Sequence, residues 1–350
     1  MIQEQLYNID NVRKTYIDYL NVVACFCVVY MHHNSAVYHY KSENLWFVSL
    51  AVETLCYWAV PIFFMISGAN LLSYRQKYST VTFLKKRIMK SLFPWISWSI
   101  GALLLQMLKG TYIVTDLNPA MLVSKILNCK IISIYWFFPA VIACYLIIPF
   151  LSSVEEKVEN AVQLFSGLCI VWFVMEYTIP LVFDFLNIAC SSELFVGGGY
   201  LLYILLGYIL DRVELVKWQR VVVYFFGVCS VIFRYAYTAV SSAEKGITDT
   251  TLFSYKQFHT VLLASAVFVL FKQINWSNIS KGLNKIVRQL SSLSLGIYLL
   301  HIVVVYQIIG KFITVDSMVW RIVAPVITYI ISGIIIWCLK QCRLTRIFVP

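Results

Sequence analysis

Charged residues are scarce in this chain, and the acidic ones are the scarcer kind. Only 13% of the 350 residues are Asp, Glu, Lys or Arg, and 17 acidic residues stand against 28 basic ones. The sequence also has no hydrophilic block long enough to fold alone, no linker rich in Pro or Ser, and no low-complexity tract. We therefore expect a single domain over residues 1–350, with no separate soluble domain.

Metal-binding and disulfide patterns are missing as well. The ten cysteines are spaced irregularly, mostly within apolar runs, and none forms a CxxC pair. Cys338 and Cys342 can share a helix face, but two thiols alone do not make a zinc site, so we expect no metal. The polar opening, and the lack of a small-residue cleavage pattern after the first apolar run, argue against a cleavable signal peptide.

What the chain does have is apolar length. Hydrophobic residues make up 60% of it and the mean hydropathy is +0.77, too high for a soluble domain of this size. A helix needs roughly 20 apolar residues to cross a hydrocarbon core of about 30 Å. Ten apolar runs recur, over residues 16–37, 45–72, 91–108, 131–151, 162–183, 195–210, 218–240, 255–271, 290–313 and 318–339. They are continuous rather than alternating, which excludes strands as the spanning element. We expect an all-α polytopic membrane protein with about ten transmembrane helices in one bundle. Pro61 inside the second run predicts a kink or a break.

The basic residues predict the orientation, because cytoplasmic loops retain Lys and Arg. The densest clusters follow the second, eighth and tenth runs, at Arg75, Lys77, Lys85, Lys86, Arg87 and Lys90, at Lys272, Lys281, Lys285 and Arg288, and at Lys340, Arg343 and Arg346. With Arg13 and Lys14 before the first run, all fall on one side. We expect both termini in the cytoplasm and the protein in the plasma or inner membrane. The net charge of +11 then reflects topology, with contacts to anionic lipid headgroups or an anionic ligand, and needs no nucleic-acid partner.

His32 is the most informative single residue, because it lies near the outer end of the first apolar run. An ionisable side chain in a span is costly unless a polar pocket or a substrate path receives it, and an imidazole titrates close to working pH. The plainer interpretation is a helix-end histidine bonded to backbone or to a lipid headgroup. His33 points about 100° away on a helix, so only one of the two faces a given site. We favour His32 and expect His33 to be interfacial.

A series of short motifs runs along nearly the whole chain. They are IDYL at 17–20, VVYMH at 28–32, VPIFFMISG at 60–68, FLKKRI at 83–88, FP at 93–94, YWFF at 135–138, YLIIP at 145–149 and SLGIYLLH at 294–301. In that order and at those separations, the set resembles the acyltransferase-3 family of membrane-bound acyltransferases, many of which O-acetylate cell-surface sugars.

The resemblance implies a ten-helix membrane fold, an acyl-CoA donor on the cytoplasmic side, and a first-helix histidine that is essential for acyl transfer. His32 matches that histidine. The family places an Arg or Lys eleven positions before it, where this chain has Asn21. The role of that cation is then either unfilled or transferred, with Arg13 or Lys14 as the candidates.

Three basic residues before the third run are candidates for the donor site. Lys85, Lys86 and Arg87 fall on the predicted cytoplasmic side, where the phosphates of acyl-CoA need charge-assisted donors. The alternative is an ordinary positive-inside cluster. Their match to the family's basic stretch keeps both interpretations open. Ser67 and Gly68 allow close helix approach, and we assign them to packing.

Other polar residues in apolar surroundings leave more than one interpretation. Glu53 either orients His32, as carboxylates do for catalytic imidazoles, or lies just above the outer membrane surface. His301 either lines the same cavity as His32 or is satisfied by a neighbouring helix. His259 and Arg234 are expected at the interface, although Arg234 could hold an anionic acceptor. The many Trp and Tyr residues, Trp136 among them, fit an aromatic belt or a sugar-stacking surface.

Together these features predict a membrane-bound O-acetyltransferase. It would transfer an acyl group, in the first instance acetyl, from acyl-CoA to a hydroxyl of a cell-surface glycan or glycolipid precursor. His32, with Glu53, is the catalytic candidate, and Lys85, Lys86 and Arg87 are the donor-binding candidates. Acetyl-CoA would be a donor substrate and not a permanently bound cofactor. The alternatives are a transporter or flippase for glycans or small metabolites, and a catalytically degenerate relative.

Overall fold

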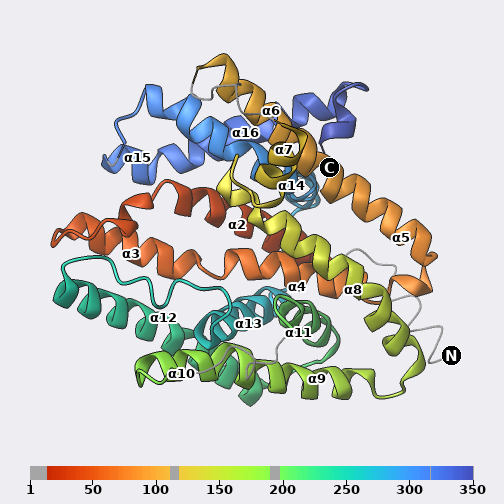
Figure 1. Cartoon of the computed structure of the whole chain (residues 1–350). Coiled ribbons are helices and arrows are strands. Elements are labelled where there is room, and N and C mark those ends of the chain that lie inside the picture. The colour runs from red at the N-terminus through yellow and green to blue at the C-terminus, as the bar shows by residue number, and fades with distance from the viewer. Residues whose placement is uncertain (1–13, 111–117, 190–197, 316, 350) are drawn as a thin grey trace.

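The computed structural model describes residues 14–110, 118–189, 198–315 and 317–349, and within these ranges every regular element is helical (Figure 1). The first half contains α2 (Thr15–His32), α3 (Asn44–Cys56), α4 (Ala59–Leu71), α5 (Thr80–Arg87), the π-helical turn η3 (Ile88–Leu92), α6 (Phe93–Leu108), α7 (Pro119–Leu127) and α8 (Phe137–Lys157). The second half contains α9 (Ala161–Trp172), the π-helical turn η6 (Phe173–Thr178), α10 (Ile179–Phe185), α11 (Leu201–Arg212), α12 (Lys217–Lys245), α13 (Phe258–Gln273), α14 (Lys281–Gln307), α15 (Met318–Ile322) and α16 (Ala324–Gln341). The predicted all-α architecture is confirmed for these ranges.

Eight helical segments in the described ranges are long and apolar enough to cross a membrane. They are Thr15–His32, Asn44–Gln76, Thr80–Leu108, Ser133–Lys157, Ala161–Phe185, Lys217–Lys245, Lys281–Lys311 and Ala324–Gln341. The two other predicted runs correspond to α11, with 12 residues, and α13, with 16, so a count of about ten full-length spans is not confirmed. The start of the run predicted over 195–210 lies outside the described residues. The chain is a multi-pass membrane protein.

The second of these segments is two helices and not one rod. α3 ends at Cys56 and α4 begins at Ala59, which confirms the predicted break. Pro61 is the third residue of α4. Its missing N–H removes no hydrogen bond there, because N–H groups in the first turn of a helix have no intrahelical partner.

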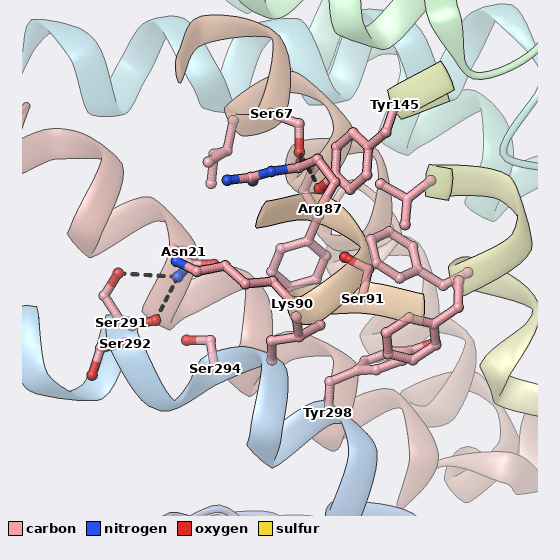
Figure 2. Close-up of a pocket in the computed structure, with 16 residues that line it drawn as sticks. Asn21, Ser67, Arg87, Lys90, Ser91, Tyr145, Ser291, Ser292, Ser294 and Tyr298 are labelled. Atoms are coloured by element: carbon pink, nitrogen blue, oxygen red, sulfur yellow. Dashed lines mark hydrogen bonds between the residues drawn. The ribbon is translucent and has the colours of Figure 1, made fainter. Parts of the chain in front are cut away.

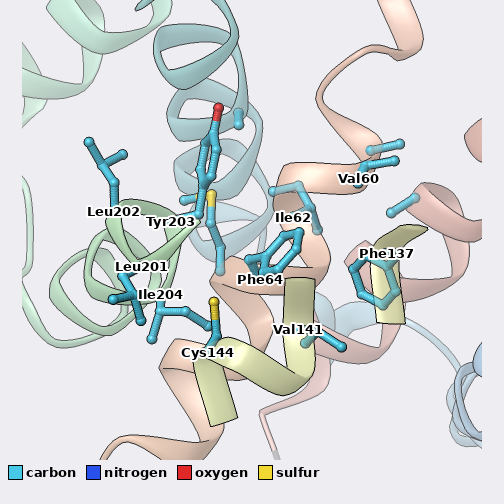
Figure 3. Packing of buried hydrophobic residues seen from close by; sticks show 14 of the residues in the cluster. Val60, Ile62, Phe64, Phe137, Val141, Cys144, Leu201, Leu202, Tyr203 and Ile204 are labelled. Carbon is cyan, nitrogen blue, oxygen red and sulfur yellow. The ribbon is translucent and has the colours of Figure 1, made fainter. Parts of the chain in front are cut away.

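α4 and α11 cross at backbone contact distance, and two glycines make this possible. A Cβ atom on Gly68 would lie 1.8 Å from the Ile204 carbonyl oxygen, and one on Gly207 would lie 2.0 Å from that of Met65. No side chain fits at either position, so the packing role predicted for Gly68 is confirmed. Figure 3 shows apolar side chains of α4, α8 and α11 meeting around this crossing, with Phe64 among those that are fully buried.

α2 and α14 pack side by side and run in the same direction. Near the start of both helices, Asn21 Nδ2 donates to Ser291 O at 2.9 Å and contacts Ser291 Oγ at 3.0 Å. Near the end of α2, the ring centroids of His32 and His301 are 5.1 Å apart. The two helices therefore hold the same register over most of the length of α2.

One end of the bundle is tied by ion pairs. Lys14 pairs with Asp211, Arg75 Nε with Glu156 at 2.7 Å, Arg212 with Glu155 at 3.6 Å, and Lys272 with Glu214 at 2.8 Å. These residues lie where α2 starts and where α4, α8, α11 and α13 end. The basic stretches that precede α6 and open α14 belong to the same end. We call it the basic end, and the opposite one the distal end.

Candidate active site

His32 ends α2 at the distal end of the bundle. Its ring lines a cavity of about 480 Å³, the distal cavity, which is also lined by residues of α6, α14 and the segment 131–134. No hydrogen bond within the described part of the chain engages its ring. His32 is thus an imidazole that faces an open cavity with both nitrogens available, and no backbone group holds it.

His301 lies beside His32 and is fully buried. Its Nδ1 is 2.7 Å from Tyr298 O and 3.2 Å from Ile297 O. Because a carbonyl oxygen can only accept, Nδ1 carries the proton, and in the neutral ring Nε2 is then the bare nitrogen. Nε2 is buried and has no hydrogen-bond partner among the described residues. His301 is therefore held by its own helix rather than by a neighbour, and presents an unused acceptor next to His32.

His33 has the opposite environment. The expectation that it is interfacial is wrong, because its side chain is completely buried. Nε2 lies 2.8 Å from Thr328 Oγ1 of α16, and the ring packs edge-on against Trp320 of α15 at 4.6 Å. The 100° step between consecutive helical residues turns His33 toward these helices and leaves His32 facing the cavity.

A second cavity, of about 280 Å³, lies nearer the basic end. We call it the basic pocket. Its polar lining includes Asn21, Arg87, Lys90, Ser291 and Ser294 (Figure 2). Figure 2 shows the Arg87 and Lys90 side chains extending across it in the same direction. Arg87 Nε is buried without a hydrogen-bond partner among the described residues, so the pocket offers a cation with unused donor capacity.

Asn21, where the family motif has an Arg or Lys, lines a pocket that contains other cations. Lys14 does not take over that role, because it is paired with Asp211 and does not line the pocket. Arg13 lies outside the described residues. Arg87 and Lys90 bring positive charge to the same pocket as Asn21, from the third apolar segment.

Of the three predicted donor-binding residues, only Arg87 lines the basic pocket. Lys85 and Lys86 are exposed, and Lys86 Nζ lies 3.9 Å above the Tyr78 ring. Lys90, which the sequence-based assignment omitted, does line the pocket. It belongs to the same basic stretch, and its position three residues after Arg87 places the two on neighbouring faces of a helical turn.

Two tyrosines connect the elements that line the basic pocket and the distal cavity. Tyr298 Oη donates to Ile134 O, and Tyr135 Oη donates to Leu299 O at 2.7 Å. Tyr298 lines the basic pocket and Ile134 lines the distal cavity, while the Tyr298 ring lies 5.7 Å from that of His301. These bonds fasten α14 to the segment before α8, so the elements that line the two cavities are held together.

Glu53 is not hydrogen-bonded to His32 in the described part of the chain. It lies in α3 with its side chain 4% exposed, next to Arg234 of α12, whose Nη1 donates to the Glu53 carbonyl oxygen at 3.1 Å. Arg234 and His259 were expected at the interface. Both are instead buried inside the protein, at 1% and 2% exposure. The structure brings His301, and not Glu53, to the side of His32.

Groups of three or more His, Cys, Asp or Glu side chains that could hold a metal ion are not found in the described ranges. The residues brought together are an imidazole that lines one cavity, a second imidazole beside it, and two cations at the other cavity, along the α2–α14 pair. Such an arrangement suits proton transfer at the distal cavity and anion binding at the basic pocket.

Comparison with known proteins supplies the family. Residues 14–339 match the model of the acyltransferase-3 family, which is described as an acyltransferase domain. No curated protein and no solved structure matches the chain. The match covers nearly all of the sequence, and the helices provide eight segments able to span a membrane. The chain therefore belongs to the acyltransferase-3 family and is a membrane acyltransferase.

Proposed function

We propose that the protein transfers an acetyl group from acetyl-CoA to a hydroxyl of a cell-surface glycan or glycolipid precursor, with His32 as general base. The observation that carries the proposal is the pair of neighbouring imidazoles at the distal cavity, 5.1 Å between ring centroids, one of them lining the cavity. Family membership supports acyl transfer in general.

The donor is assigned to the basic pocket. Arg87 and Lys90 supply charge-assisted donors for the phosphates of CoA, and Asn21 and the α14 serines supply neutral polar contacts. From Asn21 to His32 is eleven residues along α2, or about 16 Å at 1.5 Å per residue. A pantetheine arm can extend over such a distance, which would bring the thioester toward His32. The positive charge of the basic end favours the cytoplasm as the side from which CoA enters.

The chemistry follows from the two imidazoles. A ring nitrogen of His32 takes the proton of the acceptor hydroxyl as its oxygen attacks the thioester carbonyl. The C–S bond then breaks, the ester forms, and the thiolate of CoA recovers the proton from the imidazolium. The bare Nε2 of His301 would accept a hydrogen bond from His32 and so stabilise its protonated form, the part that a carboxylate plays for many catalytic histidines. In this scheme His301 takes the orienting role first assigned to Glu53.

Acetyl transfer is tested with the purified full-length protein. Radiolabelled acetyl-CoA is added to the protein in detergent, together with glycolipids and polysaccharide extracted from cells that lack the protein. We expect label in the glycan fraction and release of free CoA. If the extract stays unlabelled, while proteoliposomes containing the protein take up the same glycans without CoA, the carrier hypothesis replaces the enzyme.

A further inference from the structure

A buried arginine near the distal end has a donor that nothing uses. Arg234 is 1% exposed, and its guanidinium carbon lies 3.6 Å from the ring centroid of Tyr57 and 4.8 Å from that of Phe253. Nε donates to Leu252 O at 3.0 Å, and Nη1 donates to Glu53 O at 3.1 Å. Nη2 is buried and makes no hydrogen bond within the described residues. The Tyr57 and Phe253 rings cover part of the guanidinium, and Nη2 is the donor left for a ligand.

A carboxylate beside it is also unused. Glu53 is 4% exposed, yet its carboxylate makes no hydrogen bond or ion pair in the described ranges. Burying a carboxylate and a guanidinium without direct pairing costs free energy, and proteins rarely keep such an arrangement unless a polar group fits between the two charges. A molecule that offers both hydroxyl donors and oxygen acceptors would satisfy both groups at once.

The surroundings of the two charges are aromatic faces. Tyr57 stacks on Tyr255 at 4.4 Å between centroids, and Tyr255 stacks on Trp136 at 5.6 Å. Trp136 and Tyr255 are partly exposed inside the bundle. Faces of this kind accept the C–H side of a sugar ring, while a few convergent polar groups orient its hydroxyls. Trp136 thus belongs to an internal stack and not to an aromatic belt at the lipid boundary.

This cluster borders the cavity that holds His32. Tyr38 lines the distal cavity, and its ring lies 5.7 Å from Phe253, one of the rings that cover Arg234. Trp136 follows Ile134, which lines the same cavity, by two residues. A ligand that spans the cluster would therefore reach the cavity where the base is located.

We propose that Glu53, Arg234, Tyr57, Tyr255 and Trp136 form the acceptor site and bind one uncharged sugar ring whose free hydroxyl is directed toward His32. The assignment rests on the proposed acetyl transfer. One carboxylate and one guanidinium balance each other, so the buried site has no excess positive charge to compensate for the desolvation of an acidic sugar's carboxylate. The site therefore favours a neutral sugar unit over a uronic acid.

The first test measures binding without any acyl donor. Saturation-transfer NMR on the full-length protein in nanodiscs would use glucose, galactose, mannose and N-acetylglucosamine as probes, with glucuronate as the acidic comparison. We expect signal from at least one neutral sugar and less from glucuronate. Glu53→Gln and Trp136→Ala should remove most of that signal, and His39→Ala, at an exposed histidine, should keep it. Equal signal in the Glu53→Gln variant, a preference for glucuronate, or no saturation with any neutral sugar would overturn the proposal.

The second test uses kinetics and separates the two proposals. In Glu53→Gln we expect the KM for the acceptor to rise about tenfold, which corresponds to roughly 1.4 kcal/mol of binding, with the KM for acetyl-CoA unchanged. A change confined to the KM for acetyl-CoA would contradict the assignment. Because Arg234 also ties two carbonyls, Arg234→Lys is informative only if its thermal unfolding matches that of the wild type. Sugar binding without acetyl transfer would support this acceptor site and refute the proposed function. Acetyl transfer that does not depend on Glu53 or Trp136 would refute this acceptor site and support the proposed function.

Discussion

The protonation of His301 is determined by its own helix, and this single fact shapes the proposed chemistry. Two carbonyl oxygens hold the Nδ1 proton, so the nitrogen left over is an acceptor. A neighbouring imidazole that has taken a proton becomes a donor, and His32 is that neighbour. In the proposed reaction, His301 therefore stabilises the protonated form of His32.

His301→Ala should lower kcat by at least about tenfold, since general-base catalysis contributes typically 10² to 10⁴-fold and part of it depends on the orienter. It should also lower the pH at which activity appears, because His32 would lose the acceptor that stabilises its protonated form. His39→Ala, at an exposed histidine, is the matched control. A pH–rate profile with unchanged shape in the His301→Ala variant would assign His301 to packing alone.

Arg87 and Lys86 are consecutive basic residues with different environments, and this makes them a second matched pair. Arg87 lines the basic pocket, whereas Lys86 lies over the Tyr78 ring at the surface. Arg87→Gln should raise the KM for acetyl-CoA about tenfold and weaken the salt dependence of that KM. Lys86→Gln should change the KM for acetyl-CoA less than twofold. Equal effects of the two substitutions would mean that the basic stretch acts only through its overall charge.

The sequence predicted these residues unevenly, for a physical reason. His32 could be predicted from the sequence, because an imidazole in an apolar run has few structural explanations. Arg87 could be predicted because the motif series located the basic stretch. Which cation of that stretch faces inward depends on helix rotation through a π-helical turn, and no pattern of charges specifies that. The surroundings of Glu53 come from α12 and from the segment after it, which are remote in sequence.

At the scale of the helix, the crossing of α4 and α11 depends on the two glycines. Gly68→Ala would place a methyl group inside the van der Waals radius of the Ile204 backbone, where neither helix can yield by a side-chain rotation. We expect a loss of about 1–3 kcal/mol of stability and a lower thermal unfolding temperature in detergent. Gly101→Ala in α6, where a Cβ atom would meet nothing within 4 Å, should leave the unfolding temperature unchanged or slightly higher. Equal stability of the two variants would contradict the close crossing.

The segment after α12 carries the ring and the carbonyl that hold Arg234, and Asp249 organises it. Burial raises the pKa of the Asp249 carboxyl, but hydrogen bonds from Lys245, Ser241 and Thr251 outweigh it and leave the pKa lowered. A lowered pKa means that the folded protein favours the ionised form, so the stabilisation is present above about pH 4 and is lost as the pH falls through the folded value. Asp249→Asn should therefore unfold at lower temperature at pH 7, and the difference from the wild type should narrow below about pH 4. A difference that stays constant down to pH 3 would exclude ionisation as its cause.

Helix lengths show what hydropathy can and cannot predict. The break in the second span was predictable because Pro61 is incompatible with a helix interior. The shortness of α11 was not, because Leu201 to Leu205 are apolar and buried against other helices. The hydropathy pattern of such a run is the same whether the residues face lipid or other helices of the protein.

At the scale of the whole molecule, a cationic pocket and a pair of histidines lie along one parallel helix pair, and the ring of Tyr298, which lines the pocket, is 5.7 Å from that of His301. The apolar runs and the charge asymmetry predicted a helical membrane bundle with one basic end. The parallel register of α2 and α14 could not be read from the sequence, because more than 260 residues separate the partners. That register is what places Asn21 in one cavity and His32 in the other.

The central claim is that His32 is the base that accepts the hydroxyl proton during acetyl transfer. It is tested most directly by measuring radiolabelled acetyl transfer, and in parallel the binding of CoA, for the wild type, His32→Ala and His39→Ala. The three purified proteins should first be shown to have the same thermal unfolding temperature. We expect His32→Ala to lose at least about 10²-fold in transfer and to bind CoA as the wild type does, while His39→Ala keeps both properties. Full transfer activity in the His32→Ala variant would contradict it.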